Sequence, residues 1–364
     1  MATGTVRATV ACVTVGTVTC AIAWLYHHRR ISTEPTTVLD LIGNTQLVHV
    51  RSLSELTGCT ILAKCEFLNP GGSSKDRVAL AIVREAEASG ALKPGGTIVE
   101  ASAGSTGVSL ALVARACGYK CLIVAADDVS PAKLQLIRAL GATLEVVKPA
   151  SIANPDHPVN VARRRAAELG GVFADQFNNL ANMRAHEHGT GREIWEQTRG
   201  RVDAFVMGAG TGGTLAGVSR FLKARKPSVR VVLADPPGSA LYNRVEHGVC
   251  YASQQQERSA RRHRYDTIME GVGCDRMTDN FEAAQVDEAH RVSDEESVKM
   301  ARFLLEHDGI FVGGSAAMNC VAAVRVARKM GPGCTIVTVL CDGGQRYLNS
   351  VYADEERNET SAKS

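Results

Sequence analysis

The sequence has few aromatic residues, almost no net charge and no metal-type cysteine pair. Aromatic residues make up 5% of the 364 residues, and 41 basic and 38 acidic side chains leave a formal charge of +3. So small a charge provides no bulk field for phosphates, which argues against a nucleic-acid-binding protein. None of the eleven cysteines forms a C-x-x-C pair, and their odd number is typical of reduced thiols in a cytosol-like compartment.

Repeats and low-complexity tracts are also absent, and the composition is that of a globular protein, with 45% apolar and 22% charged residues. At roughly 150 residues per domain, the chain has room for about two domains. Glycine is abundant, at 34 residues, and several glycine clusters follow apolar segments, where loops often carry function.

Residues 8–26 carry no charge. As a helix, these 19 residues would be about 28 Å long, close to the roughly 30 Å of a bilayer core. The HHRR sequence at 27–30 lacks the small residues of a signal-peptidase site, and 8–26 lacks the arginine-rich pattern of a transit peptide, so we predict an uncleaved membrane anchor. Arg7 before the anchor, with Arg29 and Arg30 after it, predicts that the body faces the cytosol.

After the anchor we predict an α/β fold with two lobes, because short β-branched runs alternate with helical patterns. The predicted strands are 97–101, 120–126, 143–147, 203–207, 229–234 and 334–341, and the predicted helices are 77–88, 106–117, 131–140, 214–225, 294–307 and 316–330. The domains are then the anchor at 1–30, an N-terminal lobe at 31–180, a C-terminal lobe at 181–350 and a polar tail at 351–364, with the first strands free to cross between lobes. Residues 250–266 are interpreted as a basic surface loop or a contact for an anionic partner.

Lys75 lies in the Gly- and Ser-rich sequence NPGGSSKDR at 69–77, just ahead of a predicted helix. A helix N-terminus and partial burial both favour the neutral form of a lysine amine. A neutral amine is what a Schiff base requires, although the same pattern fits a surface lysine in a capping turn.

A second motif, EASAGSTG at 100–107, connects a predicted strand to an apolar helix. Backbone amides and small hydroxyl residues at a helix start can bind a carboxylate. The alternative is a plain turn in which Ser102 or Ser105 caps the helix.

A third motif, GAGTGGT at 208–214, again lies between a strand and a helix and predicts a phosphate-binding loop. Gly208, Gly210 and Gly213 also satisfy G-x-G-x-x-G, and Asp235 follows at the end of the next strand. An NAD-binding oxidoreductase is therefore the rival hypothesis, but it gives no role to the Lys75 loop.

The last motif is DGGQRY at 342–347, directly after the strand 334–341. Open α/β sheets bind ligands beyond the carboxyl ends of their strands, so Cys341 and Asp342 can reach a cleft there. A simple strand-end turn is the alternative.

In this order, the four motifs resemble the cysteine synthase and cystathionine β-synthase family of fold type II pyridoxal-phosphate enzymes, over residues 38–350. The resemblance implies the two-lobed fold of tryptophan synthase β, a homodimer and pyridoxal 5'-phosphate as cofactor. The residues it implies for the substrate are Ser102, Ala103, Gly104, Thr106, Gln176 and Gly271, and those for the cofactor are Lys75, Ser105, Gly210, Thr211, Gly212, Gly213, Thr214, Gly314 and, near the pyridine nitrogen, Cys341 or Asp342.

The chain departs from the family at Ser105, where the usual T-S-G-N-T-G has an Asn that contacts the 3′ oxygen of the cofactor. With the basic loop and the anchor, this departure resembles a fungal subgroup of cysteine synthase-like proteins of the mitochondrial outer membrane. That subgroup implies the same location, with another cytosol-facing membrane as the alternative.

The resemblance implies a β-replacement, in which Lys75 binds the cofactor and an O-acetylserine-like substrate reacts with sulfide or another thiol to give cysteine. No haem-site or regulatory-domain pattern accompanies the motifs, which favours cysteine over cystathionine synthesis or serine β-elimination. A membrane-tethered scaffold without activity is the remaining alternative.

Overall fold

The computed structural model describes residues 37–252 and 267–353. The described residues from 41 to 353 belong to one compact unit. The predicted anchor at 8–26, most of the basic loop and most of the polar tail lie outside the described residues. Within the described ranges, no helix is long and apolar enough to cross a membrane.

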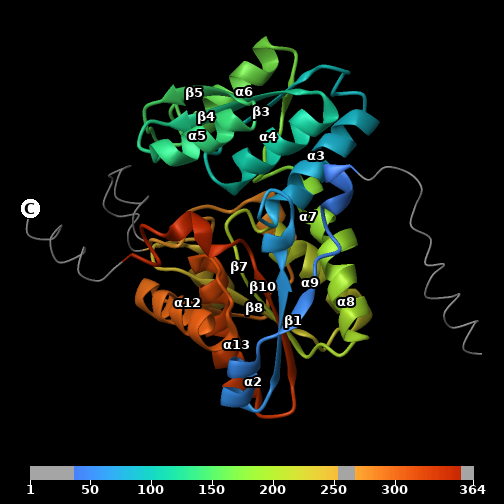
Figure 1. The fold of residues 1–364 in the computed structure, drawn as a ribbon, viewed down its shortest axis with the longest axis vertical. Helices are drawn as coiled ribbons and strands as arrows, with labels where there is room; N and C mark the ends of the chain where they lie inside the picture. Colours follow the sequence, from blue (N-terminus) through green and yellow to red (C-terminus); the bar gives the residue numbers. More distant parts are fainter. Residues whose placement is uncertain (1–36, 253–266, 354–364) are drawn as a thin grey trace, which may run out of the picture. The chain divides into compact units, whose positions relative to one another are not determined.

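Two sheets organise the compact unit, as the alternating pattern predicted (Figure 1). The smaller sheet is fully parallel, in the order β5 (Thr143–Val147), β4 (Lys120–Ala126), β3 (Thr97–Glu100) and β6 (Val172–Phe173). The larger sheet has the order β1 (Leu47–His49), β2 (Thr60–Cys65), β10 (Thr335–Leu340), β7 (Ala204–Gly208), β8 (Arg230–Asp235) and β9 (Glu288–Arg291), and only β1 and β2 pair antiparallel. The first two strands of the chain therefore belong to the sheet built by its C-terminal half. We call the parts around the smaller and larger sheets the small lobe and the large lobe.

The helices of the small lobe are α4 (Ser105–Cys117), α5 (Pro131–Ala139) and α6 (Pro158–Glu168). Those packed with the large sheet or between the lobes are α2 (Arg51–Thr57), α3 (Lys75–Ala88), α7 (Ala181–Ala185), α8 (Arg192–Thr198), α9 (Gly213–Arg225), α10 (Leu241–His247), α11 (Asp279–Glu282), α12 (Asp294–Asp308) and α13 (Gly314–Met330). The short helices are η1 (Val38–Leu41), η2 (Glu66–Leu68), the π-helix η3 (His186–Gly191) and η5 (Gly344–Tyr347).

The core of the large lobe is centred on β10, whose residues are buried on both faces of the sheet. Ile336 and Leu340 pack in the cluster that contains α13, whereas Val337 and Val339 pack in the cluster that contains α9. All four are fully buried, because α13 covers one face and α9 the other (Figure 1). A parallel strand covered on both faces is apolar throughout, which explains the continuous run in the sequence.

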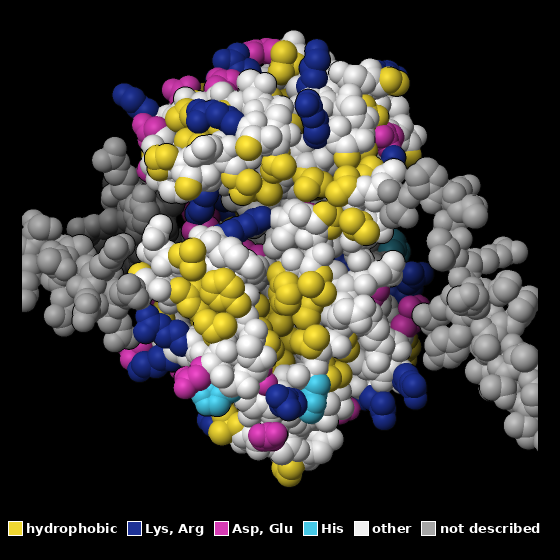
Figure 2. Space-filling model, viewed as in Figure 1, with side chains coloured by type: hydrophobic (Ala, Val, Ile, Leu, Met, Phe, Trp, Pro, Cys, Tyr) yellow, Lys and Arg dark blue, Asp and Glu magenta, His cyan; other side chains and the backbone are white. Residues whose placement is uncertain are grey.

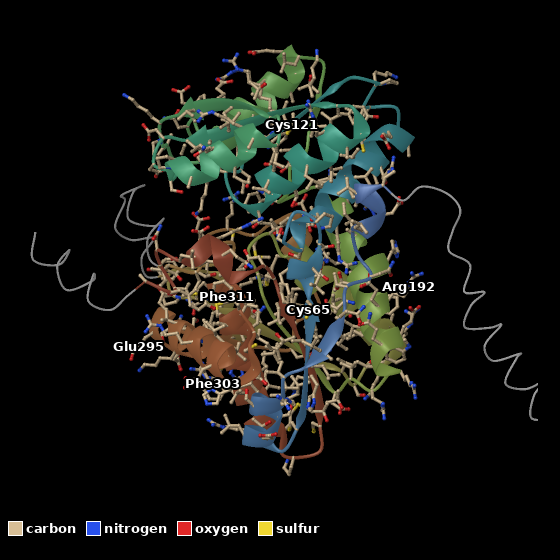
Figure 3. The ribbon with its side chains drawn as sticks, viewed as in Figure 1. Cys65, Cys121, Arg192, Glu295, Phe303 and Phe311 are labelled. Carbon is tan, nitrogen blue, oxygen red and sulfur yellow. The ribbon has the colours of Figure 1, made fainter. Side chains whose placement is uncertain are left out.

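The nine cysteines of the described ranges are all free thiols. Cys65 ends β2 in the large lobe and Cys121 lies in β4 of the small lobe, far apart in the molecule (Figure 3). Burial raises the pKa of Cys65 to about 11 and that of Cys121 to about 12, so both behave as apolar side chains.

Candidate active site

A cavity of about 320 Å³ lies where loops of the two lobes meet. Four predicted loops contribute to its lining: the lysine loop (69–75), the serine loop (101–106), the glycine loop (208–214) and the strand-end loop (341–347). Residues 176–177, 270–273 and 315 complete it. Helices α3, α4, α9 and α13 begin at these loops or beside them, so four N-termini face the cavity region. The predicted site residues that line it are Lys75, Ser102, Gly104, Ser105, Thr106, Gln176, Gly210, Thr211, Gly212, Thr214, Gly271, Cys341 and Asp342.

Three predicted site residues do not line this cavity. Ala103 lines an adjoining outer cavity of about 820 Å³ instead. Gly213 turns toward Asn182, whose Oδ1 would lie 2.0 Å from a Cβ at this position. Gly314 packs against Met269, whose sulfur would lie 2.3 Å from a Cβ at position 314. Both glycines therefore allow close packing behind the site.

Lys75 is the first residue of α3, and its side chain is half-buried at the cavity. The lysine loop is held against the strand-end loop, since the Ser74 amide donates to the Cys341 carbonyl at 3.0 Å and Ser73 pairs with Asp342. Burial lowers the pKa of Lys75, although the neighbouring groups of Cys341 and Asp342 act in the opposite direction. The arrangement thus favours a neutral amine.

Asp76 fixes the lysine loop from behind. Its carboxylate is fully buried and accepts hydrogen bonds from the Gly71 amide and the Ser109 hydroxyl of α4. A Cβ at Gly71 would lie 2.3 Å from the same carboxylate, so only glycine permits this closure. The loop that carries Lys75 is therefore tied to the start of the small lobe.

Four buried charged side chains, which we call the ion network, anchor α3 to the large lobe. Arg77 donates to Glu66 at 2.7 Å and to Glu193 at 2.6 Å, and Lys64 contacts Glu193 at 2.6 Å. Although burial acts in the opposite direction, Arg77 and Lys64 lower the pKa of Glu193 to about 2. Two cations balance two carboxylates, as a buried network requires.

The serine loop is held by Glu100, a buried carboxylate at the end of β3. It accepts hydrogen bonds from the Ala101 amide at 2.7 Å and the Gln176 amide at 3.1 Å. The Gln176 side chain in turn accepts from the Thr106 hydroxyl at 2.6 Å. Burial raises the pKa of Glu100 to about 7. The serine loop and Gln176 therefore form one connected wall of the cavity.

The glycine loop joins β7 to α9, as predicted, and its glycines are required by close contacts. Gly212 has a φ of +86°, and a Cβ there would lie 2.5 Å from the backbone of Phe281. At Gly210 a Cβ would lie 2.3 Å from the Gly271 carbonyl. The Thr214 hydroxyl contacts the ring of His186 at 3.1 Å. The glycine loop therefore lines the cavity at the N-terminus of α9, an arrangement that suits a phosphate.

His186 lies in the π-helix. It is fully buried between the hydroxyls of Thr190, at 2.9 Å, and Thr214. Burial holds the pKa of His186 well below its ordinary value, so the ring is neutral. Its contact with the Thr214 hydroxyl orients that side chain. Separately, the described ranges contain no cluster of side chains that could bind a metal ion.

The strand-end loop forms a polar end of the cavity. Asp342 is only 4% exposed, and its Oδ2 accepts a hydrogen bond from the Tyr347 hydroxyl at 2.6 Å. Its Oδ1 is buried and has no hydrogen-bond partner within the part of the chain that the structure describes. Burial raises the pKa of Asp342 to about 6 and that of the Cys341 thiol to about 11.

The sequence did not single out Ser315, Tyr347, Glu270 and Phe177, which also line the cavity. Ser315 follows the predicted Gly314, and Tyr347 lies inside the DGGQRY motif, so both stood beside recognised signals. Glu270 pairs with Lys133 of α5 at 2.5 Å and links the two lobes at the cavity mouth. No local pattern marks such a contact between distant segments.

Asp235, the predicted partner of a dinucleotide ribose, ends β8 but does not line the cavity. It is fully buried, and its carboxylate accepts a hydrogen bond from the Tyr242 amide at 2.7 Å. Its role here is to hold the start of α10.

Comparison with known proteins gives concordant results. Residues 38–342 match a family model described as "Pyridoxal-phosphate dependent enzyme". Cysteine synthase 2 of Schizosaccharomyces pombe is 52% identical over 330 residues, which cover 87% of this chain and 84% of the relative. A protein of Saccharomyces cerevisiae provisionally named a mitochondrial cysteine synthase is 47% identical over 342 residues, covering 91% and 87%. The crystal structure of O-ureido-L-serine synthase aligns with a TM-score of 0.77 and 32% identity, covering 91% of this chain and all of that one.

Proposed function

Because the chain belongs to the family of pyridoxal-phosphate-dependent enzymes, we propose that it is a cysteine synthase that joins an activated serine such as O-acetylserine to sulfide. The observation that carries the proposal is the half-buried Lys75, with its lowered pKa, in a cavity shared by a glycine loop and a serine loop. Relatives at about half identity bear the name cysteine synthase. The enzyme is a transferase with pyridoxal 5'-phosphate as its cofactor.

The residues around the cavity fit this cofactor. The glycine loop offers backbone amides at the start of α9, with the hydroxyls of Thr211 and Thr214, and so would hold the phosphate. Lys75 would hold the aldehyde carbon through its amine. In this proposal the G-x-G-x-x-G pattern serves the phosphate of pyridoxal phosphate and not an NAD cofactor, and the family match supports that choice. When bound, the cofactor delocalises the electron pair left at the substrate α-carbon.

Lys75 has two tasks in this proposal. As a neutral amine it would hold the cofactor at its aldehyde carbon. The same amine would accept the α-proton of the substrate as a general base. The lowered pKa serves both tasks, because a protonated amine can neither bond nor accept a proton.

The serine loop would bind the carboxylate of the amino-acid substrate. Ser102 and Thr106 line the cavity at the start of α4, where backbone amides are left without helical partners. Glu100 and Gln176 hold this loop in place, so the carboxylate meets a preformed wall. The β-carbon is then exposed to sulfide entering from the outer cavity.

The strand-end loop would face the pyridine nitrogen. Cys341 and Asp342 are the proposed partners, and Ser315 joins them, because its hydroxyl hydrogen-bonds to the Cys341 thiol. A neutral thiol or hydroxyl there stabilises an unprotonated ring nitrogen, whereas an ionised carboxylate stabilises a protonated one.

The direct experiment is to add O-acetylserine to the purified, cofactor-loaded protein and to record its visible spectrum before sulfide is supplied. A spectral change that sulfide reverses, with cysteine formed, supports cysteine synthesis. A bound cofactor whose spectrum ignores O-acetylserine would leave the scaffold hypothesis. Turnover of serine with homocysteine, or of serine alone, would favour cystathionine synthesis or β-elimination, and Lys75→Ala is the matched inactive control.

Location and assembly are further parts of the proposal. We place the enzyme at the mitochondrial outer membrane, attached through residues 8–26 with the body in the cytosol. A relative with a mitochondrial name supports the address. Carbonate extraction and protease treatment of intact mitochondria test it, since a soluble or protease-protected protein would contradict it.

We also propose a homodimer. Apolar side chains gather on the face of both lobes shown in Figure 2. Large apolar side chains that are more than half exposed include Leu56, Leu68 and Leu348. Exposed apolar surface of this kind is typical of protein interfaces. Light scattering on the purified protein would refute the dimer by giving the mass of a single chain.

A further inference from the structure

Arg346 connects the two lobes behind the cavity, and no role has been assigned to it so far. It lies in η5, just after β10 of the large lobe. Its Nη1 donates to the Ser105 hydroxyl oxygen at 3.1 Å, and its Nη2 donates to the Gly71 carbonyl. One guanidinium thus contacts both the serine loop and the lysine loop.

The charge of the guanidinium acts on two buried carboxylates. These are Asp76 and Asp342, and the positive charge of Arg346 lowers the pKa of each, against the larger effect of burial. Both acidic residues are buried, at 0% and 4% exposure. Arg346 itself is half-buried, so its charge is only partly screened by solvent.

The contact with Ser105 decides what that hydroxyl can do. A serine hydroxyl has one hydrogen to donate and two lone pairs that accept. Arg346 can only donate, so it occupies a lone pair of the Ser105 oxygen. Among residues 37–252 and 267–353 we find no acceptor for the Ser105 hydrogen. Since Ser105 lines the cavity, that hydrogen is available to a bound ligand.

We propose that Arg346 is a positioning residue that makes Ser105 a dedicated hydrogen-bond donor toward the ring oxygen of pyridoxal phosphate next to its aldehyde. This inference rests on the proposed function, because it requires that cofactor in the cavity. A hydroxyl that accepts from a cation is polarised and donates more strongly. In this chain, a serine with an arginine behind it supplies the donor that an asparagine amide would supply alone.

The test is a comparison of Arg346→Gln in two backgrounds, wild type and Ser105→Asn. Apoprotein is titrated with pyridoxal phosphate to obtain the dissociation constant, and the visible spectrum of the loaded protein is recorded across pH. In wild type, Arg346→Gln weakens cofactor binding on the order of tenfold and shifts the absorption of the bound cofactor. In Ser105→Asn, the same change alters binding less than about twofold, because the amide carries its own donor.

Equal losses in both backgrounds would overturn the proposal, since Arg346 would then act through Gly71 or the fold. An unchanged dissociation constant and spectrum in wild type would overturn it as well. Ser105→Ala keeps the arginine and its contact with Gly71, and it must reproduce the loss seen with Arg346→Gln. If Ser105→Ala leaves the spectrum unchanged, the donor role is refuted even where Arg346→Gln does not fold.

Arg302→Gln is the matched control, because Arg302 also donates to a carbonyl, that of Ala353, at 2.9 Å but outside the cavity. It leaves cofactor binding unchanged. All readouts use the cofactor without substrate. A protein that shows the predicted coupling but makes no cysteine would refute the proposed function and leave this inference intact.

Discussion

Removing Arg77 from the ion network should destabilise the large lobe far more than removing any exposed arginine. In Arg77→Met, Glu66 loses both of its bonds to the guanidinium, at 2.7 and 2.8 Å, and stays fully buried. Glu193 keeps Lys64 as its partner. One carboxylate is thus left without a balancing charge.

The size of the effect follows from that imbalance. Breaking a buried ion pair by removing one partner costs about 3–5 kcal/mol, because an uncompensated charge remains in a poorly solvated place. Changing Glu66 to Gln in the Arg77→Met background removes this charge, so roughly half of the loss should return. Arg84, whose side chain is 57% exposed beside Glu87, gives the control: Arg84→Met should cost less than about 1 kcal/mol.

Urea unfolding of the apoproteins, followed by circular dichroism and Trp195 fluorescence, measures these differences without the linkage to cofactor binding. Trp195 lies in α8, two residues after Glu193. A loss for Arg77→Met no larger than for Arg84→Met would refute the reasoning, and so would a double variant that is less stable than the single one. The pKa of Glu193 is lowered from 4.5 to about 2, so the ionised Glu193 adds about 3 kcal/mol to the free energy of unfolding. This contribution is complete above pH 4.5 and is lost as the pH falls toward 2.

Three further predictions concern the cavity. Lys75→Ala should still admit the cofactor, but borohydride will no longer fix it covalently and cysteine formation will fall by at least about a thousandfold; a covalent adduct at another lysine would contradict the assignment. Gly212→Ala should weaken cofactor binding, measured by titration, on the order of a hundredfold, because the φ of +86° and the backbone of Phe281 leave no room for a Cβ. Binding of wild-type strength would refute this steric argument. The pKa of Glu100 is raised from 4.5 to about 7, so the free energy of unfolding should fall as the pH rises from 4.5 to 7. Glu100→Gln should flatten this dependence on pH. An unchanged slope would exclude Glu100 as its source.

Much of the fold could be predicted because its signals are local. The predicted strands at 120–126 and 143–147 match β4 and β5 to the residue, since β-branched runs there end at turn-forming residues. The pairing of β2 with β10 joins Thr60 to Thr335, which are 275 residues apart, and no local pattern reports such a contact. The π-helix at 186–191 was also missed, because its extra residue per turn reflects packing against α9.

In the candidate site, too, residues within local motifs were predicted and residues that depend on distant contacts were missed. The lysine, serine and glycine loops were predicted, because glycines and hydroxyls between a strand and a helix have a meaning within a few residues. Glu270 and Phe177 were missed, since they reach the cavity only through the meeting of the lobes. Gly213 and Gly314 belong to the right loops, but contacts with Asn182 and Met269 turn them away from the cavity.

The four helices that begin around the cavity give it a positive electrostatic potential. Each helix N-terminus is equivalent to roughly half a positive charge, so α3, α4, α9 and α13 together approach two elementary charges. The reaction proposed here brings together a phosphate, a carboxylate and a sulfide anion, all of which this field attracts. The site should therefore gather anions from dilute solution, act faster at low ionic strength, and be inhibited by sulfate or inorganic phosphate through competition for the same field.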